Sequence, residues 1–332
     1  MPPPNPPHFN SMPPSSPQAS PVTGKPAAPP DRLAFLISAY RDPEHLARLI
    51  AALDDRADFY VHLDARVDER PFRSVLPRKV RFVPRHRISW GGWQQVVYQH
   101  ELLRAALASG TAYSHLVCLS AQDYPLWSNS RIHRYFREHA DRQFIGGHDL
   151  TLTDDAQQLR KITCLHPFRD LDFPSQWLKD KLVVASRTVL RLLGVRRRPV
   201  VKLGGKPCHV FFGSDYWALT PDCARHVCHV LESEPAFCRY FRTAFVPSEL
   251  CVQTIVYNSR FAPSDAVLPN PYPGLTRLTP LHFIDYGEGI RQLTMDDLPR
   301  LQQSGKMFCR KVVSGVSDEL TRHIDLLRQA AD

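Results

Sequence analysis

Several signatures of common enzyme classes are missing from this sequence of 332 residues. It contains no G-x-x-x-x-G-K-[ST] loop, no G-x-G-x-x-G after an apolar strand and no G-x-S-x-G elbow. These absences exclude the phosphate-binding loops of kinases and dehydrogenases and the nucleophile of α/β-hydrolases. The only Asp-x-Asp, Asp170-Leu171-Asp172, does not follow an apolar strand, and we interpret it as a surface loop. We therefore expect no metal and no cofactor.

Long apolar runs and paired cysteines are missing as well. Nothing approaches the roughly 18 consecutive apolar residues of a membrane span, and we see no signal peptide. The eight cysteines include no C-x-x-C, and several fall inside apolar segments, which is typical of free thiols in a reducing compartment. We expect a cytoplasmic protein.

Basic residues outnumber acidic ones and give a formal net charge of +9. No RNA-binding signature or zinc-finger spacing accompanies this charge, so we expect no nucleic-acid partner. One dense basic run covers residues 187–206 and surrounds Leu190, Leu192 and Leu193. A solvated basic face is the favoured interpretation of this run. The alternative is peripheral contact with an anionic lipid surface, such as the inner membrane surface.

Proline is concentrated at the N-terminus, where the first 30 residues hold 12 of the 30 prolines. Large apolar side chains are almost absent there, so the segment cannot bury enough surface to offset the loss of chain entropy. We predict that residues 1–31 are a disordered tail. The folded part is predicted to cover 32–313, followed by an amphipathic C-terminal helix within 314–332.

Apolar segments alternate with amphipathic ones over about 115 residues after the tail. Strands are expected at 33–37, 59–64, 80–83, 115–119 and 144–145. Helices are expected to begin at Asp42 and after Trp93, and around 132–139. This order predicts an α/β fold with a mostly parallel central sheet flanked by helices. Residues 146–206 are predicted to be a less regular insertion, and later helices to begin at 220–222, 247–249 and Ser317.

Candidate site residues follow from where these elements begin and end. The strand ending at Leu119 runs into Asp123, and ligands of open α/β sheets bind at the carboxyl ends of strands. Arg310 and Lys311 are adjacent cations, and alternation along a strand predicts that at most one of them enters a given site. Glu249, in the first turn of its helix, is a candidate general base. A glutamate that only complements the helix dipole is the alternative.

These segments resemble the core-2/I-branching β-1,6-N-acetylglucosaminyltransferases and the peptide O-xylosyltransferases that share their domain. Residues 120–125 (S-A-Q-D-Y-P) are similar to the family's S-G-Q-D-Y-P, 213–217 to its G-S-x-W-W, and 247–249 to its P-D-E. Further similar segments are 35–40, 42–43, 60–64, 90–92, 281–286, 297–298 and 308–311. The likeness covers about residues 32–313.

The resemblance implies a GT-A-like fold, with a nucleotide-sugar half at about 32–146 and an acceptor and catalytic half at about 147–313. It implies an inverting, metal-independent transfer of a sugar from a UDP-sugar to a hydroxyl of a glycan or glycoconjugate. N-acetylglucosamine and xylose are the expected sugars. The rival hypothesis is a catalytically silent, carbohydrate-binding relative in a polysaccharide assembly pathway.

The resemblance also implies roles for single residues. Glu249 corresponds to the catalytic base, and Lys311 to the lysine that contacts the donor diphosphate. Other donor-side candidates are Arg310, Asp123 and Asp64, and the acceptor-side candidates are Tyr216, Trp217 and Asp215. The family's second diphosphate-binding cation has no counterpart at the expected spacing, where Arg277 and Arg291 are loose substitutes.

Overall fold

The computed structural model describes residues 30–173, 175–263, 267–268, 270–287 and 289–331. Its main sheet has the strand order β10-β4-β1-β2-β3, and every neighbouring pair except β10 with β4 is parallel. The strands are β1 (Leu33–Ala39), β2 (Ala57–Leu63), β3 (Arg81–Phe82), β4 (His115–Ser120) and β10 (Ala218–Leu219). The predicted α/β class with a mostly parallel central sheet is therefore confirmed.

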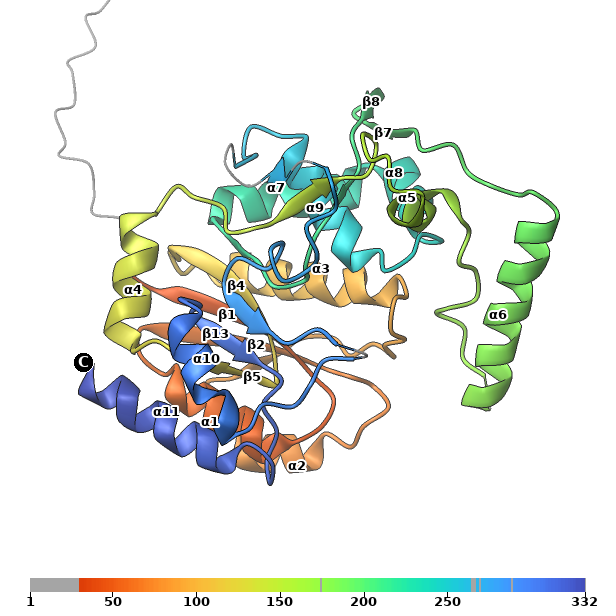
Figure 1. Ribbon diagram of the computed structural model, residues 1–332. Coiled ribbons are helices and arrows are strands. Elements are labelled where there is room, and N and C mark those ends of the chain that lie inside the picture. The colour runs from red at the N-terminus through yellow and green to blue at the C-terminus, as the bar shows by residue number, and fades with distance from the viewer. Residues whose placement is uncertain (1–29, 174, 264–266, 269, 288, 332) are drawn as a thin grey trace, which may run out of the picture.

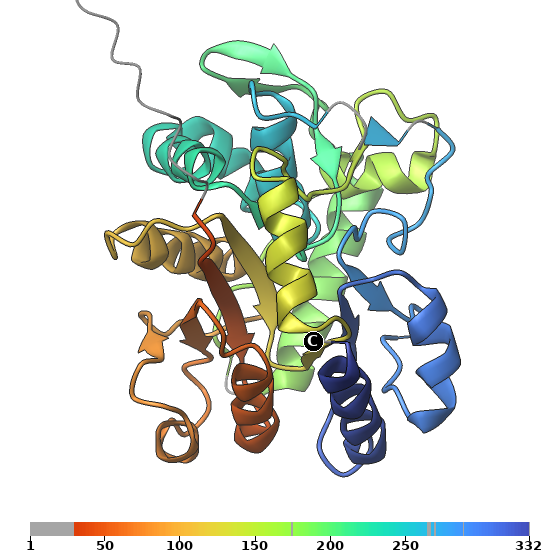
Figure 2. The ribbon, with the colours of Figure 1, turned by 90° about the vertical axis from the view of Figure 1, so that its left-hand side faces the viewer.

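Helices cover both faces of this sheet (Figures 1 and 2). Ala34 and Leu36 of β1 belong to one core, and Phe35 and Ile37 to another, as the alternation of a doubly buried strand requires. The first core includes residues of α3 (Gln94–Leu107), α7 (Pro221–Ser233), α8 (Pro235–Phe241) and α9 (Ser248–Tyr257). The second includes residues of α1 (Pro43–Ala52), α2 (Arg70–Val75) and α4 (Asn129–Glu138).

Helix starts lie where the capping signals indicate. The Asp42 carboxylate accepts a hydrogen bond from the His45 amide at 3.1 Å, directly before Pro43. Thr220 Oγ1 accepts one from the Cys223 amide at 3.4 Å in the same way. Both side chains satisfy a backbone donor that the first helical turn leaves unpaired, so the helix starts predicted at these positions are confirmed.

A second sheet extends the molecule toward its C-terminus. It has the order β12-β13-β5, formed by β12 (His282–Ile284), β13 (Phe308–Arg310) and β5 (Asp123–Pro125). Leu320 and Ile324 of α11 (Asp318–Ala330) pack against Tyr124 in the adjoining core. The remaining elements on this side are η1 (Met295–Asp297) and α10 (Leu298–Gln303). A third sheet has the order β11-β6-β9, from β11 (Val267–Leu268), β6 (Gly147–Asp149) and β9 (Phe211–Phe212).

The insertion at 146–206 is more regular than predicted. It contains α5 (Ala156–Thr163), the 17-residue α6 (Gln176–Leu192) and a hairpin of β7 (Val201–Leu203) with β8 (Lys206–Cys208). Many apolar side chains of α6 face solvent, so its sequence has no clean buried stripe from which a helix could be predicted. Residues 144–145 form an isolated bridge from Phe144 to Ala218 instead of the expected strand.

The predicted tail lies outside the described residues except for its last two. Of these, Asp31 forms an ion pair with Arg137 at 3.4 Å and therefore contacts the folded part. None of the helices within the described residues is suited to cross a membrane.

Candidate active site

A cavity of about 730 Å³ lies at the carboxyl ends of the parallel strands. Ser38 of β1, Ser120 of β4 and Asp64, which follows β2, line its floor. Side chains of α6 and Glu249 in the first turn of α9 line its sides. This is the edge where open α/β sheets bind ligands, as the sequence predicts for residues 120–123.

Glu249 and Asp215 form a pair of carboxylates in this cavity. Burial, together with the negative charge of Asp215, raises the pKa of Glu249 well above its ordinary value. Burial also raises the pKa of Asp215 to about 6, although this carboxylate accepts hydrogen bonds from Gln99 at 3.2 Å and Ser248 at 3.1 Å. Two close carboxylates cannot both ionise easily, so the pair titrates as a unit.

The tertiary structure adds Lys161 of α5 to this pair. Its ammonium lies 3.2 Å from the ring centroid of Phe212 and 5.0 Å from that of Tyr272. Burial lowers the pKa of Lys161 to about 8, while the charge of Glu249 opposes that shift. The sequence gives no sign of this position, because nothing in the pattern of α5 distinguishes Lys161 from a surface lysine.

Asp123 is completely buried beneath the cavity. It accepts hydrogen bonds from the Ser120 amide at 2.7 Å and from Arg310 at 2.9 Å, and His282 Nε2 lies 3.3 Å away. Burial raises its pKa, but these donors outweigh burial and lower it overall. The β13–β5 register places Arg310 directly opposite Asp123. Asp123 therefore orients Arg310, whose guanidinium also lies over the Tyr216 ring at 5.3 Å.

Arg310 and Lys311 both line the cavity, contrary to the predicted alternation. Strand β13 ends at Arg310, so the alternation of strand side chains does not extend to Lys311. Within the described residues no carboxylate forms an ion pair with Lys311. Burial and the neighbouring charges of Arg41 and Arg310 lower its pKa. Arg310 is paired with Asp123, but Lys311 has no such partner in the described part of the chain, and its charge favours an anionic ligand.

Arg41 is held beside Lys311 through Gln122. The Gln122 side chain accepts from Arg41 Nη2 at 3.4 Å, and its backbone carbonyl accepts from the Val312 amide at 2.9 Å. Arg291, which the sequence offered as a substitute cation, instead pairs with Asp285 at 3.0 Å. Arg41 was missed because it comes about 270 residues before Lys311 and only the fold brings them together.

The other predicted site residues have different positions. Asp64 lines the cavity and binds Arg66 Nη2 at 2.7 Å; burial raises its pKa, but the hydrogen bonds from Arg66 outweigh burial and lower it. Tyr216 lines the cavity as well. Trp217, by contrast, is 0% exposed within the core and does not line the cavity.

The Asp170-Leu171-Asp172 segment has a structural role. The Asp170 carboxylate accepts hydrogen bonds from the amides of Trp93 at 2.7 Å and Gln94 at 3.3 Å, at the start of α3. Asp172 pairs with Arg87 at 3.2 Å. Asp170 thus caps a helix that begins 76 residues earlier in the chain, which local sequence patterns could not reveal.

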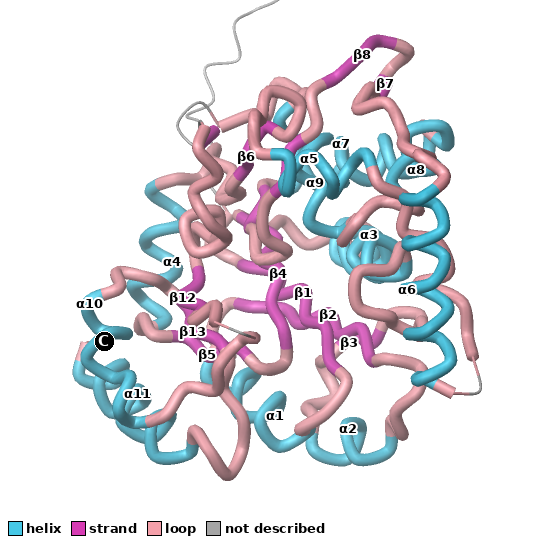
Figure 3. Tube along the Cα trace, turned by 45° about the vertical axis from the view of Figure 1, so that its right-hand side comes forward, coloured by secondary structure: helices cyan, strands magenta, loops and turns pink. Residues whose placement is uncertain are grey.

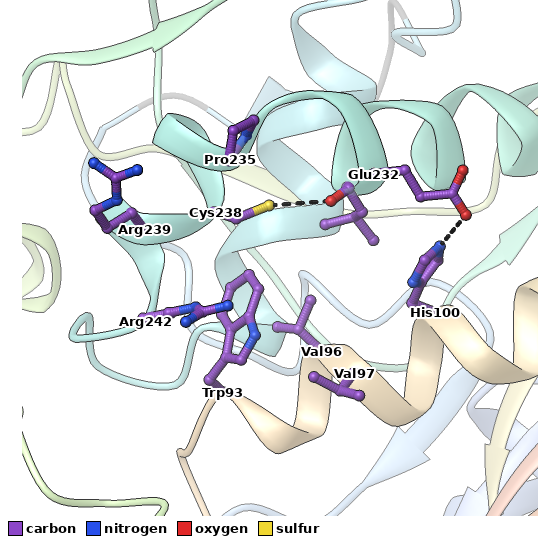
Figure 4. Close-up of a pocket in the computed structure, with 10 residues that line it drawn as sticks. Trp93, Val96, Val97, His100, Glu232, Pro235, Cys238, Arg239 and Arg242 are labelled. Atoms are coloured by element: carbon purple, nitrogen blue, oxygen red, sulfur yellow. Dashed lines mark hydrogen bonds and ion pairs between the residues drawn. The ribbon is translucent and has the colours of Figure 1, made fainter. Parts of the chain in front are cut away.

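A smaller pocket of about 360 Å³ lies between α3, α7 and α8 (Figure 4). Several of its polar groups have partners: His100 pairs with Glu232 at 3.1 Å, and the Cys238 thiol donates to a backbone carbonyl at 3.4 Å. Arg242 lies over the Trp93 ring. The larger cavity, with its ionisable pair and the cation Lys311, is therefore the candidate active site.

Comparison with known proteins shows the family of this chain. The family model described as "Branch: Core-2/I-Branching enzyme" matches residues 33–267. The chain belongs to this family. Members of the Core-2/I-branching family are GT-A-like glycosyltransferases. The matched segment includes Asp215, Glu249 and the other cavity-lining residues that precede position 267.

Xylosyltransferases are among the proteins to which this chain is similar. Xylosyltransferase 2 of Mus musculus is 24% identical over 319 residues, and that of Homo sapiens is 25% identical over 316; each alignment covers 90% of this chain and 34% of the relative. Xylosyltransferase oxt of Drosophila melanogaster is 24% identical over 245 residues, which cover 70% of this chain and 25% of the relative. This chain thus spans about a third of the length of the mouse and human relatives.

Proposed function

We propose that this protein is an inverting, metal-independent glycosyltransferase that moves a sugar from a UDP-sugar to a hydroxyl of a glycan or glycoconjugate. N-acetylglucosamine and xylose are the candidate sugars, the latter favoured by the names of the relatives. The observation that carries the proposal is that Glu249, with its raised pKa, and Lys311 line one cavity, with the charge of Arg41 beside Lys311.

In the proposed reaction Glu249 is the general base. The acceptor hydroxyl oxygen attacks the anomeric carbon and passes its proton to the Glu249 carboxylate. The bond from that carbon to the phosphate oxygen breaks, and its electron pair leaves with the nucleoside diphosphate. Attack from the face opposite the leaving group inverts the configuration. A raised pKa makes Glu249 a stronger base than an ordinary carboxylate.

Positive charge for the leaving diphosphate comes from Lys311 and Arg41. Two cations aimed at a departing anion stabilise the charge that develops on it, which is the part a divalent metal takes in other transferases. We assign Arg41 as the second diphosphate-binding cation of the family, for which the sequence spacing offered no counterpart. Arg310 supports Tyr216 at the side of the cavity and is held in place by Asp123.

On the acceptor side we assign Asp215 and Tyr216, both of which line the cavity. Trp90 is 67% exposed at the cavity rim and has Phe245 against its edge at a centroid distance of 5.7 Å. A braced, exposed indole offers a flat apolar surface with a polar edge to the acceptor. Asp64 is assigned to the donor nucleoside because it lies at the carboxyl end of β2.

A screen of nucleotide sugars tests the proposal. A true donor stabilises the folded state by mass action, so the melting temperature should rise with one UDP-sugar and with UDP, and should not rise with CMP or GDP. Release of UDP in the presence of an acceptor then establishes turnover. Donor binding without turnover on any acceptor would favour the catalytically silent relative, and no shift with any UDP-sugar would refute the proposed donor.

A further inference from the structure

Helix α6 carries an unusual concentration of exposed apolar side chains. Figures 1 and 3 show it along one side of the molecule, between long connecting segments. Among the described residues 17 large apolar side chains are exposed, and six of these lie between Trp177 and Leu193. The most exposed are Leu192 at 81%, Leu193 at 70% and Trp177 at 68%. Apolar surface gathered in this way marks an interaction site.

The helix has two faces with different environments. Lys179 and Val183, four residues apart, line the active-site cavity, and Lys179 donates a hydrogen bond to Ser89 at 2.6 Å. Trp177, Val184 and Leu192 follow each other at intervals of seven and eight residues and are all exposed. Such spacing places side chains on one face of a helix. The outer face is therefore apolar, while the inner face lines the cavity.

Exposed cations accompany this outer face. They are Lys181, Arg187 and Arg191 on the helix and Arg196 and Arg198 directly after it. None of these five forms an ion pair with a carboxylate in the part of the chain that the structure describes. Arg197 differs from its neighbours, since it donates to the carbonyl of Cys164 at 3.3 Å and serves the fold. An exposed apolar face with unpaired cations beside it is the pattern of helices that lie in a lipid interface.

We propose that α6 docks the protein on an anionic lipid surface, with its outer apolar side chains in the headgroup region and its cations on the phosphates. A second copy of the chain fits this face less well, because a symmetric contact would bring the same unpaired cations against each other. The proposal is independent of the glycosyl-transfer reaction. The segment proposed to contact lipid is α6 and not the whole basic run at 187–206, since Lys202 and Lys206 lie on the separate β7–β8 hairpin.

Vesicle sedimentation with the full chain tests this docking. We expect binding to vesicles of phosphatidylglycerol and phosphatidylcholine in equal parts, little binding to phosphatidylcholine alone, and release by high salt. Replacing both Arg187 and Arg191 by Gln should weaken binding about thirtyfold, from roughly 1 kcal/mol per cation near an anionic surface. Replacing Trp177, Leu192 and Leu193 by Ser should weaken it at least about tenfold.

The matched control replaces Lys202 and Lys206 by Gln, which removes the same charge from the hairpin. This control should bind within about twofold of wild type, and all variants should keep the wild-type melting temperature because the altered side chains face solvent. Equal losses in the control and the arginine variant would show that net charge, and not α6, drives binding. The proposal would also be overturned by wild-type protein that binds neither vesicle, or by a Ser variant that keeps vesicle binding but changes from dimer to monomer in sedimentation velocity.

Discussion

At the scale of single residues, the proposed reaction depends on the carboxylate of Glu249. Its helix N-terminus stabilises the anion and would make it a weak base, whereas burial and Asp215 act in the opposite direction. The structure shows that the second effect is larger, because the pKa of Glu249 is raised. Glu249 is therefore suited to accept a proton, beyond complementing the helix dipole.

The Glu249→Gln variant should keep the fold and the affinity for the donor but lose turnover by about 10²–10⁴-fold, the usual contribution of a general base. The amide is nearly isosteric with the carboxylate, so only proton acceptance is removed. Initial rates and donor binding measured on the same preparation check this. Glu44→Gln, in the first turn of α1, is the control and should be fully active. Turnover within threefold of wild type in Glu249→Gln would leave Glu249 as a structural residue.

The pH dependence of the rate follows from the same pair. A base works only when deprotonated, so a raised pKa means that turnover increases as pH rises through that pKa, above the range of an ordinary carboxylate. In Asp215→Asn the negative neighbour is gone, the pKa of Glu249 falls, and the rising limb of the profile should move to lower pH. A limb that stays in place in this variant would show that Asp215 does not interact with the titrating group.

Lys311→Ala and Arg41→Ala should each weaken UDP binding by about 1.5–3 kcal/mol, the range for hydrogen bonds to charged groups. Neither cation has a carboxylate partner among the described residues, so neither removal leaves a buried anion behind. Titration calorimetry with UDP measures the effect, and Lys202→Ala on the distant hairpin is the control. Unchanged UDP affinity in Arg41→Ala would show that Arg41 does not bind the diphosphate and would leave Lys311 as the one assigned cation.

At the scale of elements, the insertion between β6 and β9 contributes side chains to the cavity and to the surroundings of the carboxylate pair. Lys179 of α6 closes the cavity from one side, and Lys161 of α5 approaches the carboxylate pair. Asp170 fixes the start of α3, from which Gln99 reaches Asp215. A segment without a clean sequence pattern therefore supports the geometry of the catalytic residues.

Asp170→Ala should lower the free energy of unfolding by about 1 kcal/mol, as expected for loss of a side chain that satisfies helix N-terminal amides. Asp172→Ala, whose partner Arg87 is exposed, should change it by less than about 0.5 kcal/mol. Urea unfolding of both variants measures the difference. Equal stability in the two variants would mean that the contacts of Asp170 with α3 contribute nothing.

At the scale of the whole molecule, the charges around the cavity bear on metal dependence. Asp170 and Asp172 are engaged in the fold, Asp123 is buried beneath Arg310, and the cavity offers cations where a metal would otherwise bind the diphosphate. We therefore expect full activity in excess chelator. Activity that chelator abolishes and Mn²⁺ restores would contradict the assignment of Lys311 and Arg41.

Much of the fold was determined by the sequence itself. Continuous apolar runs such as 33–37 and 115–119 are stable in a strand that is buried on both faces. The caps Asp42 and Thr220, each followed by proline, satisfy helix amides locally. Motif order likewise indicated the family and pointed to Glu249. These signals act between neighbours in the chain, which is why sequence reveals them.

Only the tertiary structure decided which distant side chains meet. Arg41 lies beside Lys311, Lys161 near Glu249, and Asp170 at the start of α3, because sheet register and helix packing bring together residues tens to hundreds of positions apart. Burial in that assembly also sets the protonation of the carboxylate pair, since desolvation depends on every element around it. The exposed face of α6 belongs here as well: its composition is written in the sequence, but that it remains uncovered is a property of the folded molecule.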